Sequence, residues 1–316
     1  MIFNSPETIV KCIRDGLVEE QHFGYLMVMN KVHILDRVGE SGNYPFYLRS
    51  CAKPLQASLM VDFGMIEHYG LTSEEIALCC ASHAGEQCHT DIAKNLLKKI
   101  GLTEDDLKCG KHKPLSVTEQ ERMLLDNENP TTLHNNCSGK HIMMLGLCKM
   151  HNWDIKTYDE PEHPLQQLIK EKLYQLCELK KEYPVTTDGC GVPIYSMPLQ
   201  NMGKGYLNLF CSEEYSQITQ AFLNNPYIIG GENRTDTKII ENSENLVAKV
   251  GAGGLCIVVN IENEECLIIK VSDCDMKARE IAVTDALRNL HWANIETDHK
   301  IKTNHGKIVG EIVSVL

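Results

Sequence analysis

The pattern of apolar and polar positions along the chain divides it into helical and extended segments. Apolar residues recur every three or four positions in seven segments, which predicts helices over 53–63, 73–81, 89–100, 140–151, 164–178, 213–224 and 277–290. Shorter aliphatic runs bounded by turn residues predict strands over 25–30, 32–36, 247–250, 254–260 and 266–272. Asn30-Lys31 is a candidate hairpin turn between the first two strands.

The order of these elements predicts the fold class. The strands gather at the two ends of the chain, and most of the helices lie between them. This order predicts an α/β fold of the α+β type, in which an antiparallel sheet built from both chain ends is covered by helices. No Pro/Ser-rich linker and no repeat interrupts the chain. We therefore expect a single domain over 1–316 with a helical lobe at about 53–180.

Length and charge restrict the class of protein. A chain of 316 residues with 43% hydrophobic content can bury a large core. A formal net charge of −12, with scattered lysines, argues against nucleic acid or an anionic membrane as partner. No apolar run approaches the roughly 18 to 20 residues that span a bilayer. Residues 1–15 carry no basic segment ahead of an apolar core, so we expect no secretion signal and a cytoplasmic location.

Fourteen cysteines are unusual for a chain of this length. Disulfides are not expected in a reducing cytoplasm, and the absence of any C-x-x-C pair excludes a zinc ribbon or a thioredoxin motif. Five of the cysteines occupy apolar positions of helical patterns, where a free thiol behaves as a small hydrophobe: Cys12, Cys79, Cys80, Cys148 and Cys177. Three others lie in glycine-rich or polar segments, namely Cys137, Cys190 and Cys256.

The segment Arg49-Ser50-Cys51-Ala52-Lys53 opens an apolar helical run through Met60. A serine and a lysine three residues apart share one helix face, so a lysine with a lowered pKa could activate the serine as a nucleophile. The spacing alone is also compatible with a helix-terminal serine and a solvated lysine. Pro54 suits the first helical turn and would place Ser50 at the positive end of the helix.

Two further segments place polar groups at predicted helix ends. Ser82-His83 follows the helix over 73–81, most simply as a capped turn with a surface histidine. The stretch from His134 to His141 gathers amide, thiol, hydroxyl and amine groups around Gly139, directly before an apolar helix. Exposed N–H groups at a helix start can bind a carboxylate or an oxyanion, which makes this stretch a candidate binding loop.

Two glycine-bounded turns complete the candidate segments. Asp188-Gly189-Cys190-Gly191 predicts a tight turn that carries an acid and a thiol. The glycines over 251–254 predict a turn between strands and do not form a phosphate loop, because no G-x-x-x-x-G-K-[ST] order is present. Lys270 stands inside a predicted strand, where it either faces solvent or has its pKa lowered by burial.

Taken together, these segments resemble the rhizobial-type L-asparaginases of the asparaginase II family. The resemblance runs from about residue 8 to the end of the chain and rests on the order and spacing of all the segments. It implies a fold similar to serine β-lactamases and glutaminases, a homodimer, and hydrolysis of L-asparagine to L-aspartate and ammonia.

The resemblance also implies roles for individual residues. Ser50 and Lys53 match the family's first serine–lysine pair, and Ser82 and Lys270 match its second. The zinc positions of family members match Cys137, Lys140 and Cys190. Substrate contacts are implied for a further set of residues, of which Asp188 also neighbours the zinc site: Arg49, His83, Asn136, Asp188 and Cys256. One departure is Gly253, which stands where the family has an acid, so the contribution of this turn to substrate binding is open.

Three alternatives remain open at this stage. A glutaminase would keep the fold and change the substrate. A penicillin-interacting hydrolase normally carries S-D-N and K-T-G after S-x-x-K, and neither string occurs here. A non-enzymatic sensor of zinc or amino acids would not need two serine–lysine pairs. The zinc would either orient the substrate's α-carboxylate or modulate an activity that does not require it.

Overall fold

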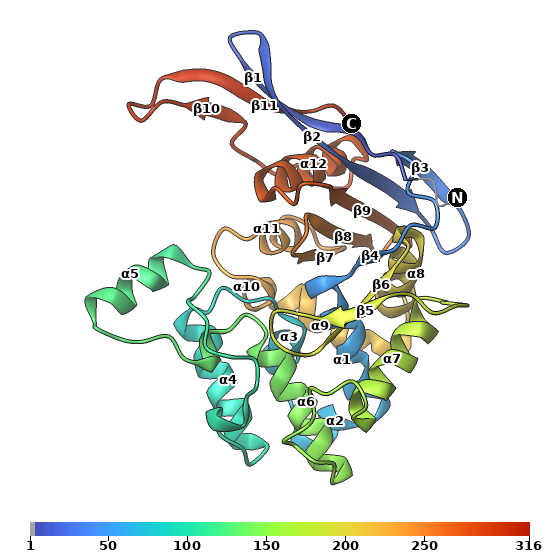
Figure 1. Ribbon diagram of the computed structural model, residues 1–316, viewed down its shortest axis with the longest axis vertical. Helices are drawn as coiled ribbons and strands as arrows, with labels where there is room; N and C mark the ends of the chain where they lie inside the picture. Colours follow the sequence, from blue (N-terminus) through green and yellow to red (C-terminus); the bar gives the residue numbers. More distant parts are fainter. Residues whose placement is uncertain (1–3) are drawn as a thin grey trace.

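An antiparallel sheet assembled from both ends of the chain forms one layer of the molecule, as predicted (Figure 1). The computed structural model describes residues 4–316; residues 1–3, which belong to the predicted domain and to the N-terminal segment considered above, lie outside the described residues. The strand order is β10 (Lys300–Lys302), β11 (Ile308–Ser314), β1 (Glu7–Arg14), β2 (Leu17–Met29), β9 (Glu265–Val271), β8 (Leu255–Asn260), β7 (Leu246–Gly251), and β3 (Ile34–Val38) also pairs with β2.

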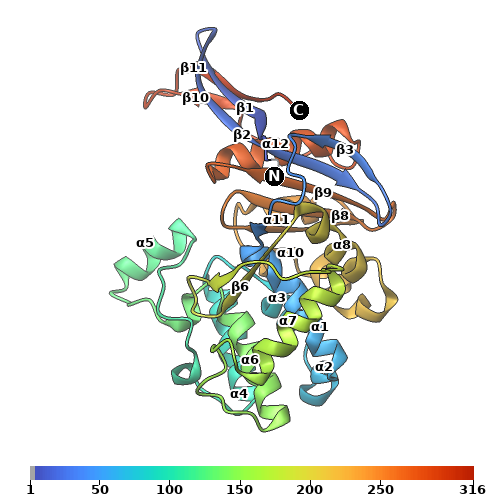
Figure 2. The ribbon, with the colours of Figure 1, turned by 45° about the vertical axis from the view of Figure 1, so that its right-hand side comes forward.

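The register joins the first and last parts of the chain. Tyr25 of β2 pairs with Lys270 of β9, and the two strands run side by side from Gly24 to Met29. Glycine is required at position 24, because a Cβ there would lie 2.4 Å from the carbonyl oxygen of Lys270. The C-terminal end of the chain lies beside this sheet in Figures 1 and 2.

Helices cover both faces of the sheet. Every residue of β7 and β8 is buried, so neither strand has a solvated face. Helix α12 (Met276–Asn289) packs on β1, β9 and β11, whereas α8 (Leu199–Phe210) packs on β2, β8 and β9. Gly203 permits this close approach of α8, since a Cβ there would lie 2.4 Å from the sulfur of Met29.

The remaining helices lie on the opposite side of β7–β9 from α12 (Figures 1 and 2). They are α1 (Lys53–Asp62), α2 (Met65–Tyr69), α3 (Ser73–Cys80), α4 (Gln87–Lys99), α5 (Val117–Leu125), α6 (Ser138–His151), α7 (Pro164–Leu176), α9 (Ser216–Asn224), α10 (Pro226–Ile229) and α11 (Thr235–Glu241). A small sheet of β4 (Phe46–Tyr47), β6 (Pro193–Met197) and β5 (Val185–Thr187) lies beside them.

The predicted helices are present with nearly the predicted bounds. The segment predicted as one helix over 213–224 consists of a 3₁₀ turn, η4 (Glu213–Tyr215), followed by α9. The turn at Asn30 joins β2 to β3, and the Asn30 side chain accepts hydrogen bonds from the backbone N–H groups of Val32 and His33. Further 3₁₀ turns are η1 (Arg49–Ala52), η2 (Glu104–Asp106) and η3 (Thr132–His134).

Close contact between α3 and α6 brings two of the predicted segments together. A Cβ on Gly139 would lie 2.1 Å from the carbonyl oxygen of Leu78, so only glycine allows this approach. The contact sets Cys137 and Lys140, at the start of α6, next to Ser82, which follows the end of α3.

All fourteen cysteines are free, and the five assigned to apolar helical positions are buried. The helical assignment of Cys12 was wrong, because it lies in strand β1. Within residues 4–316, none of the helices combines the length and the apolar character needed to span a bilayer.

Candidate active site

The first feature of the site is a strained turn directly before Ser50. Arg49 has a φ of +50°, a left-handed conformation that L-residues rarely adopt. Its Nε donates a 2.9 Å hydrogen bond to Oδ1 of Asp188, which holds the side chain in place. Ser50 then lies in η1, and α1 begins at Lys53 with Pro54 in its first turn. Such strain is commonly concentrated at functional sites.

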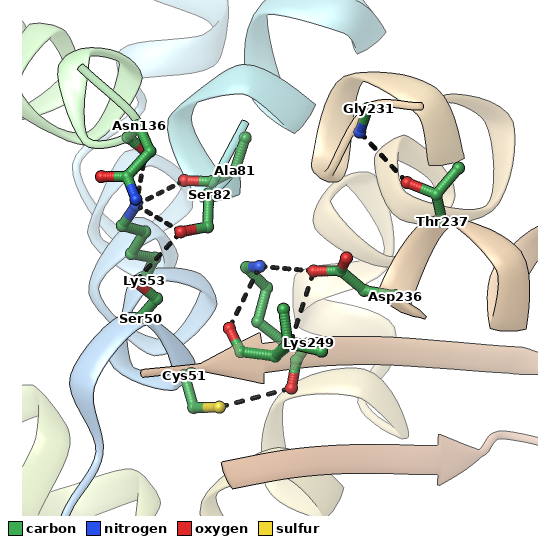
Figure 3. Close-up of polar contacts among 12 residues, drawn as sticks. Ser50, Cys51, Lys53, Ala81, Ser82, Asn136, Gly231, Asp236, Thr237 and Lys249 are labelled. Atoms are coloured by element: carbon green, nitrogen blue, oxygen red, sulfur yellow. Dashed lines mark hydrogen bonds and ion pairs between the residues drawn. The ribbon is translucent and has the colours of Figure 1, made fainter. Parts of the chain in front are cut away.

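Lys53 lies in the centre of a polar group from three segments (Figure 3). Its Nζ lies 2.7 Å from the carbonyl oxygens of both Ala81 and Asn136, and 3.3 Å from Oγ of Ser82. The Ser82 and Ser50 hydroxyl oxygens are 3.0 Å apart. Only 1% of Lys53 is exposed, so the alternative of a solvated lysine is wrong.

The two carbonyl oxygens and the hydroxyl around Lys53 determine whether its neutral amine can accept a proton. Carbonyl oxygens only accept hydrogen bonds, so the two of them take both N–H groups of a neutral amine. The remaining lone pair then points toward the Ser82 hydroxyl. Burial lowers the pKa of Lys53, and the nearby Lys140 and Lys249 cations lower it further, although Cys137 opposes them. The arrangement therefore forms a hydrogen-bonded path from Ser50 through Ser82 to a basic amine.

Lys270 does not take part in this path. Its Nζ donates a 2.7 Å hydrogen bond to the carbonyl oxygen of Val271, and its ammonium lies over the ring of Phe46. Among residues 4–316, no hydrogen bond joins Lys270 to Ser82, so the predicted second serine–lysine pair is not formed. Lys270 is partly buried, and burial lowers its pKa.

The predicted zinc residues meet in one buried cluster. Lys140 Nζ lies 3.0 Å from Sγ of Cys190, and Cys137 contacts Cys190 as well. Hydrogen bonding to Cys190 holds the pKa of Cys137 well below its usual range, and Lys53 and Lys140 act in the same direction. Although burial opposes the charge of Lys140, its pKa is raised by Cys137 and Cys190. Asp188 lies close enough to act on both charges.

This donor set fits a zinc ion. Two thiols and an amine converge from α6 and from the turn before β6, and neither thiol is tied up in a disulfide. Thiolates with one nitrogen donor form the soft, incomplete coordination shell in which zinc keeps an open position. In the structure as described, Lys140 is an ammonium that donates to Cys190, so metal binding has to displace its proton.

Two residues predicted to contact the substrate are inaccessible to it. His83 is fully buried, and its Nε2 is 2.9 Å from Oγ of Ser138, so it is not the surface histidine of the simplest interpretation. Burial holds the pKa of His83 well below its usual range, which keeps the ring neutral. Cys256 is fully buried in β8. Neither side chain can touch a substrate in this structure.

Asn136 and Asp188 remain near the group formed by Ser50, Ser82 and Lys53. The backbone carbonyl of Asn136 accepts from Lys53, while its side-chain oxygen accepts from the thiol of Cys137. Asp188 closes the predicted tight turn, in which the Gly191 N–H donates to the Asp188 carbonyl over 2.9 Å. Asn136 therefore connects Lys53 to the thiol cluster, and Asp188 connects that cluster to Arg49.

A hollow of about 530 Å³ is lined by Arg49, the residue before Ser50, and by Lys270, together with Phe46, Tyr47 and Gly253. Gly253 has a φ of +80°, which favours glycine and accounts for the residue at the point where the family has an acid. Without that acid, the hollow presents two cationic side chains and a glycine. This arrangement suits a small ligand with a negative charge.

A buried ion pair near Ser50 was not predicted from the sequence. Lys249 of β7 and Asp236 of α11 are fully buried, and their Nζ and Oδ2 atoms are 2.7 Å apart (Figure 3). The carbonyl oxygen of Lys249 accepts a 3.3 Å hydrogen bond from the thiol of Cys51, the residue after Ser50. The available signal was a lysine inside a run that is otherwise apolar, directly before the glycines over 251–254.

A buried group formed by Ser50, Ser82 and Lys53 lies at the start of α1, and the sheet beside the helices is antiparallel. Comparison with known families assigns the chain: the L-asparaginase II profile matches residues 10–313, nearly the whole chain. The chain therefore belongs to the L-asparaginase II family, which is an amidohydrolase family.

Other comparisons give weaker similarity. The chain is similar to the solved structure of a β-lactamase from Mycobacterium bovis, with 12% identity, a TM-score of 0.44, and 85% of this chain and 94% of that chain covered. It is also similar to the solved structure of a protein from Bacteroides dorei that is provisionally assigned as a β-lactamase. The identity is 11% and the TM-score 0.42, with 78% of this chain and 85% of that chain covered. No curated protein matches this chain in sequence.

Proposed function

We propose that this protein is an L-asparaginase that hydrolyses L-asparagine to L-aspartate and ammonia through Ser50. The observation that carries the proposal is the environment of Lys53, whose two carbonyl neighbours leave one lone pair free for the Ser82–Ser50 path. Membership of the L-asparaginase II family supports amide hydrolysis as the reaction.

In the first half of the reaction, Ser50 Oγ attacks the side-chain carbonyl carbon of asparagine. The Ser50 proton moves to Ser82, and the Ser82 proton moves to the neutral amine of Lys53. The resulting ammonium then protonates the leaving nitrogen through the same path, and the carbon–nitrogen bond breaks. Ammonia leaves, and an ester joins Ser50 to the β-carboxyl carbon of the aspartyl product.

In the second half, water takes the place of ammonia. Lys53, neutral again, accepts a proton from the attacking water through Ser82, and the ester bond to Ser50 breaks. The proton returns to Ser50 Oγ, so the enzyme is regenerated with L-aspartate as the second product. The position of Ser50 at the start of α1 favours the negative charge that develops on the carbonyl oxygen in both halves.

Substrate recognition is assigned to the hollow next to Arg49. Arg49 and Lys270 line it, and either cation can bind the α-carboxylate of asparagine. Asp188 already accepts a hydrogen bond from Arg49 and lies next to the thiol cluster, so it can pair with the α-ammonium group. The hollow therefore distinguishes an amino acid from a neutral amide by charge.

We propose that Cys137, Cys190 and Lys140 are the ligands of a zinc ion. The ion would supply a positive charge for a substrate carboxylate. When the metal is bound, the three side chains hold their unprotonated forms. Without the metal, the Cys137 thiol donates to the side-chain oxygen of Asn136, whose backbone carbonyl accepts from Lys53. The reaction steps above use only Ser50, Ser82 and Lys53.

L-asparagine is expected to be the preferred substrate of the purified protein. Ammonia release would be measured with L-asparagine, L-glutamine and a chromogenic β-lactam under the same conditions. We expect rapid release from asparagine, much slower release from glutamine, because its longer side chain displaces the amide from Ser50, and no β-lactam turnover. Equal or greater turnover of glutamine would make the protein a glutaminase, and no release from either amide would favour the sensor.

Zinc content is expected to depend on Cys137. Protein purified without chelator should contain about one zinc per chain at this cluster, and Cys137→Ser should remove it, because a serine hydroxyl is a poor zinc ligand near neutral pH. Occupancy should fall as pH falls, since thiolates and an amine bind only without their protons. Elemental analysis over a pH series measures both effects.

The matched control is Cys148→Ser, a buried cysteine in the same helix that lies away from the cluster. If zinc is bound at this cluster, the zinc content of Cys148→Ser should equal that of the unmodified protein. If the zinc content is the same in Cys137→Ser as in the unmodified protein, the metal lies elsewhere. If neither the unmodified protein nor Cys137→Ser contains zinc, the cluster has a packing or redox role.

A further inference from the structure

Three groups that commonly bind metals meet on β1 and β2, away from the candidate active site. The Cys12 sulfur, a Glu20 carboxylate oxygen and a His22 ring nitrogen all lie within 4.8 Å of one another. His22 Nε2 is 3.9 Å from the Cys12 sulfur and 3.8 Å from Glu20 Oε2. Figures 1 and 2 show these strands at the opposite end of the molecule from α6, which carries Cys137 and Lys140.

Strand geometry brings these side chains to one face. Cys12 lies directly opposite Glu20 in the antiparallel pair, so their side chains point the same way. His22 follows two residues after Glu20 and therefore shares its face. The register shifts between Cys12 and Ile13, an irregularity that re-aims side chains locally. Cys12 and His22 are nearly buried, whereas Glu20 is exposed.

His22 is already oriented as a metal ligand. Its Nδ1 is 2.8 Å from Oδ2 of Asp273, so Nε2 is the nitrogen that faces Cys12 and Glu20. Asp273 comes from the segment between β9 and α12, which makes the contact independent of the hairpin. A carboxylate that fixes the second ring nitrogen is a common support of metal-bound histidine, because it sets the tautomer and the ring orientation.

The charges around the cluster leave a negative excess. Glu20 and Asp273 each contact His22, and Asp275 also lies near Cys12. Within residues 4–316, neither Glu20 nor Asp273 forms an ion pair with a lysine or an arginine. Burial and then Glu20 raise the pKa of the Cys12 thiol to about 11, so a bound ion has to displace the thiol proton. A divalent cation would balance the carboxylates.

The donor distances suit a tetrahedral ion. Zinc ligands at about 2.0–2.3 Å from the metal lie roughly 3.4–3.6 Å from one another in tetrahedral geometry. The sulfur–nitrogen and nitrogen–oxygen separations here, 3.9 and 3.8 Å, need only a small inward movement. One sulfur, one nitrogen and one oxygen donor favour zinc or cobalt over magnesium or calcium, which prefer oxygen alone.

We propose that Cys12, Glu20 and His22 form a second metal site, which binds one divalent ion of the zinc type with water in the fourth position. Asp273 is the positioning residue of this site. The ion would tie the hairpin of β1 and β2 to the segment that leads into α12. Because the ion would bind the folded chain and not the unfolded one, it would stabilise the fold. The melting temperature should therefore rise with the concentration of the ion.

Cobalt binding tests this site separately from the thiol cluster of Cys137 and Cys190. The host is the Cys137→Ser/Cys190→Ser double variant, stripped of metal and titrated with Co²⁺. We expect one Co²⁺ per chain with a thiolate-to-cobalt charge-transfer band. Adding Cys12→Ser should abolish the band, and adding Asp273→Asn should weaken binding by about 10- to 100-fold while keeping the band.

Cys88→Ser is the matched control, because Cys88 belongs to another group of potential ligands, Glu86, Cys88 and His89. Loss of the band in that variant, and not in Cys12→Ser, would place the ion there and overturn the proposal. If the host binds no cobalt, the proposal is wrong, and His22 only links the carboxylates of Glu20 and Asp273. If the host does not fold by circular dichroism, the comparison uses the unmodified protein, in which Cys12→Ser must bind one ion fewer.

Discussion

Replacing Ser50 with alanine is expected to lower the turnover of L-asparagine by about 10⁴- to 10⁶-fold, because the covalent route disappears with the nucleophile. The fold should persist, since Ser50 contributes only a hydroxyl to a site held by Lys53 and its backbone acceptors. Steady-state ammonia release and a thermal melt of the same sample measure the two quantities. A loss of turnover with an unchanged melting temperature is the expected result.

The matched control is Ser58→Ala on the same helix, α1. Ser58 is also fully buried, but its hydroxyl donates to the carbonyl oxygen of Leu55 and does not touch the site. Its removal should leave turnover near that of the unmodified protein. Ser82→Ala should be slower than Ser58→Ala, because it breaks the path to Lys53. If Ser50→Ala keeps most activity and Ser82→Ala loses it, the two serines have the opposite roles.

Removal of the Asp236 carboxylate is expected to destabilise the protein by about 3–5 kcal/mol, since it leaves the fully buried ammonium of Lys249 without a partner. Asp236→Ala should also reduce turnover, because the Lys249 backbone accepts from Cys51 next to the nucleophile. Urea unfolding of the two proteins at neutral pH measures the free energy difference.

The double variant Asp236→Leu/Lys249→Met separates charge from packing. It replaces both partners by apolar side chains of similar size, so most of the lost stability should return. An Asp236→Ala variant as stable as the unmodified protein would show that Lys249 is neutral or finds water. A double variant as unstable as the single one would show that volume, and not charge, determines the cost.

The helices and the central strands could be predicted because their signals are local. The start of α1 at Lys53 and the end of α3 before Ser82 follow from apolar periodicity and turn residues within each segment. Helix α8 was missed, since Gly203 and Gly205 lower its local helix propensity. Those glycines are explained by tertiary contacts, with Met29 and with the sulfur of Cys177, which the segment itself does not reveal.

The outer strands were missed for a related reason. Strand β1 carries Lys11 between its apolar residues and ends at Arg14, and no residue of β11 is fully buried. Each is recognisable as a strand only through its partner, since Val10 pairs with Ser314 at the other end of the chain. Long-range pairing of this kind is not contained in a local pattern.

The same distinction applies to the site. The short-range Ser50–Lys53 spacing and the resemblance together predicted residues that the structure does bring together, including Cys137, Lys140 and Cys190. Lys270 does not contact Ser82 in the structure, where the carbonyl oxygens of Ala81 and Asn136 hold Lys53 beside Ser82 instead. Backbone acceptors carry no sequence signature, and neither does the burial that removes His83 and Cys256 from the substrate.

The sheet order also constrains how the protein is made. Strand β2 occupies a central position in the sheet, but its partner β9 is synthesised late, and only α12, β10 and β11 follow it. Tyr25 therefore cannot pair until Lys270 has been synthesised. At about 5–20 residues per second, this wait lasts on the order of ten to fifty seconds. During that time one edge of β2 is unpaired, and the nascent chain can join a neighbour through it. Expression conditions that slow synthesis should therefore increase aggregation before they affect the folded enzyme.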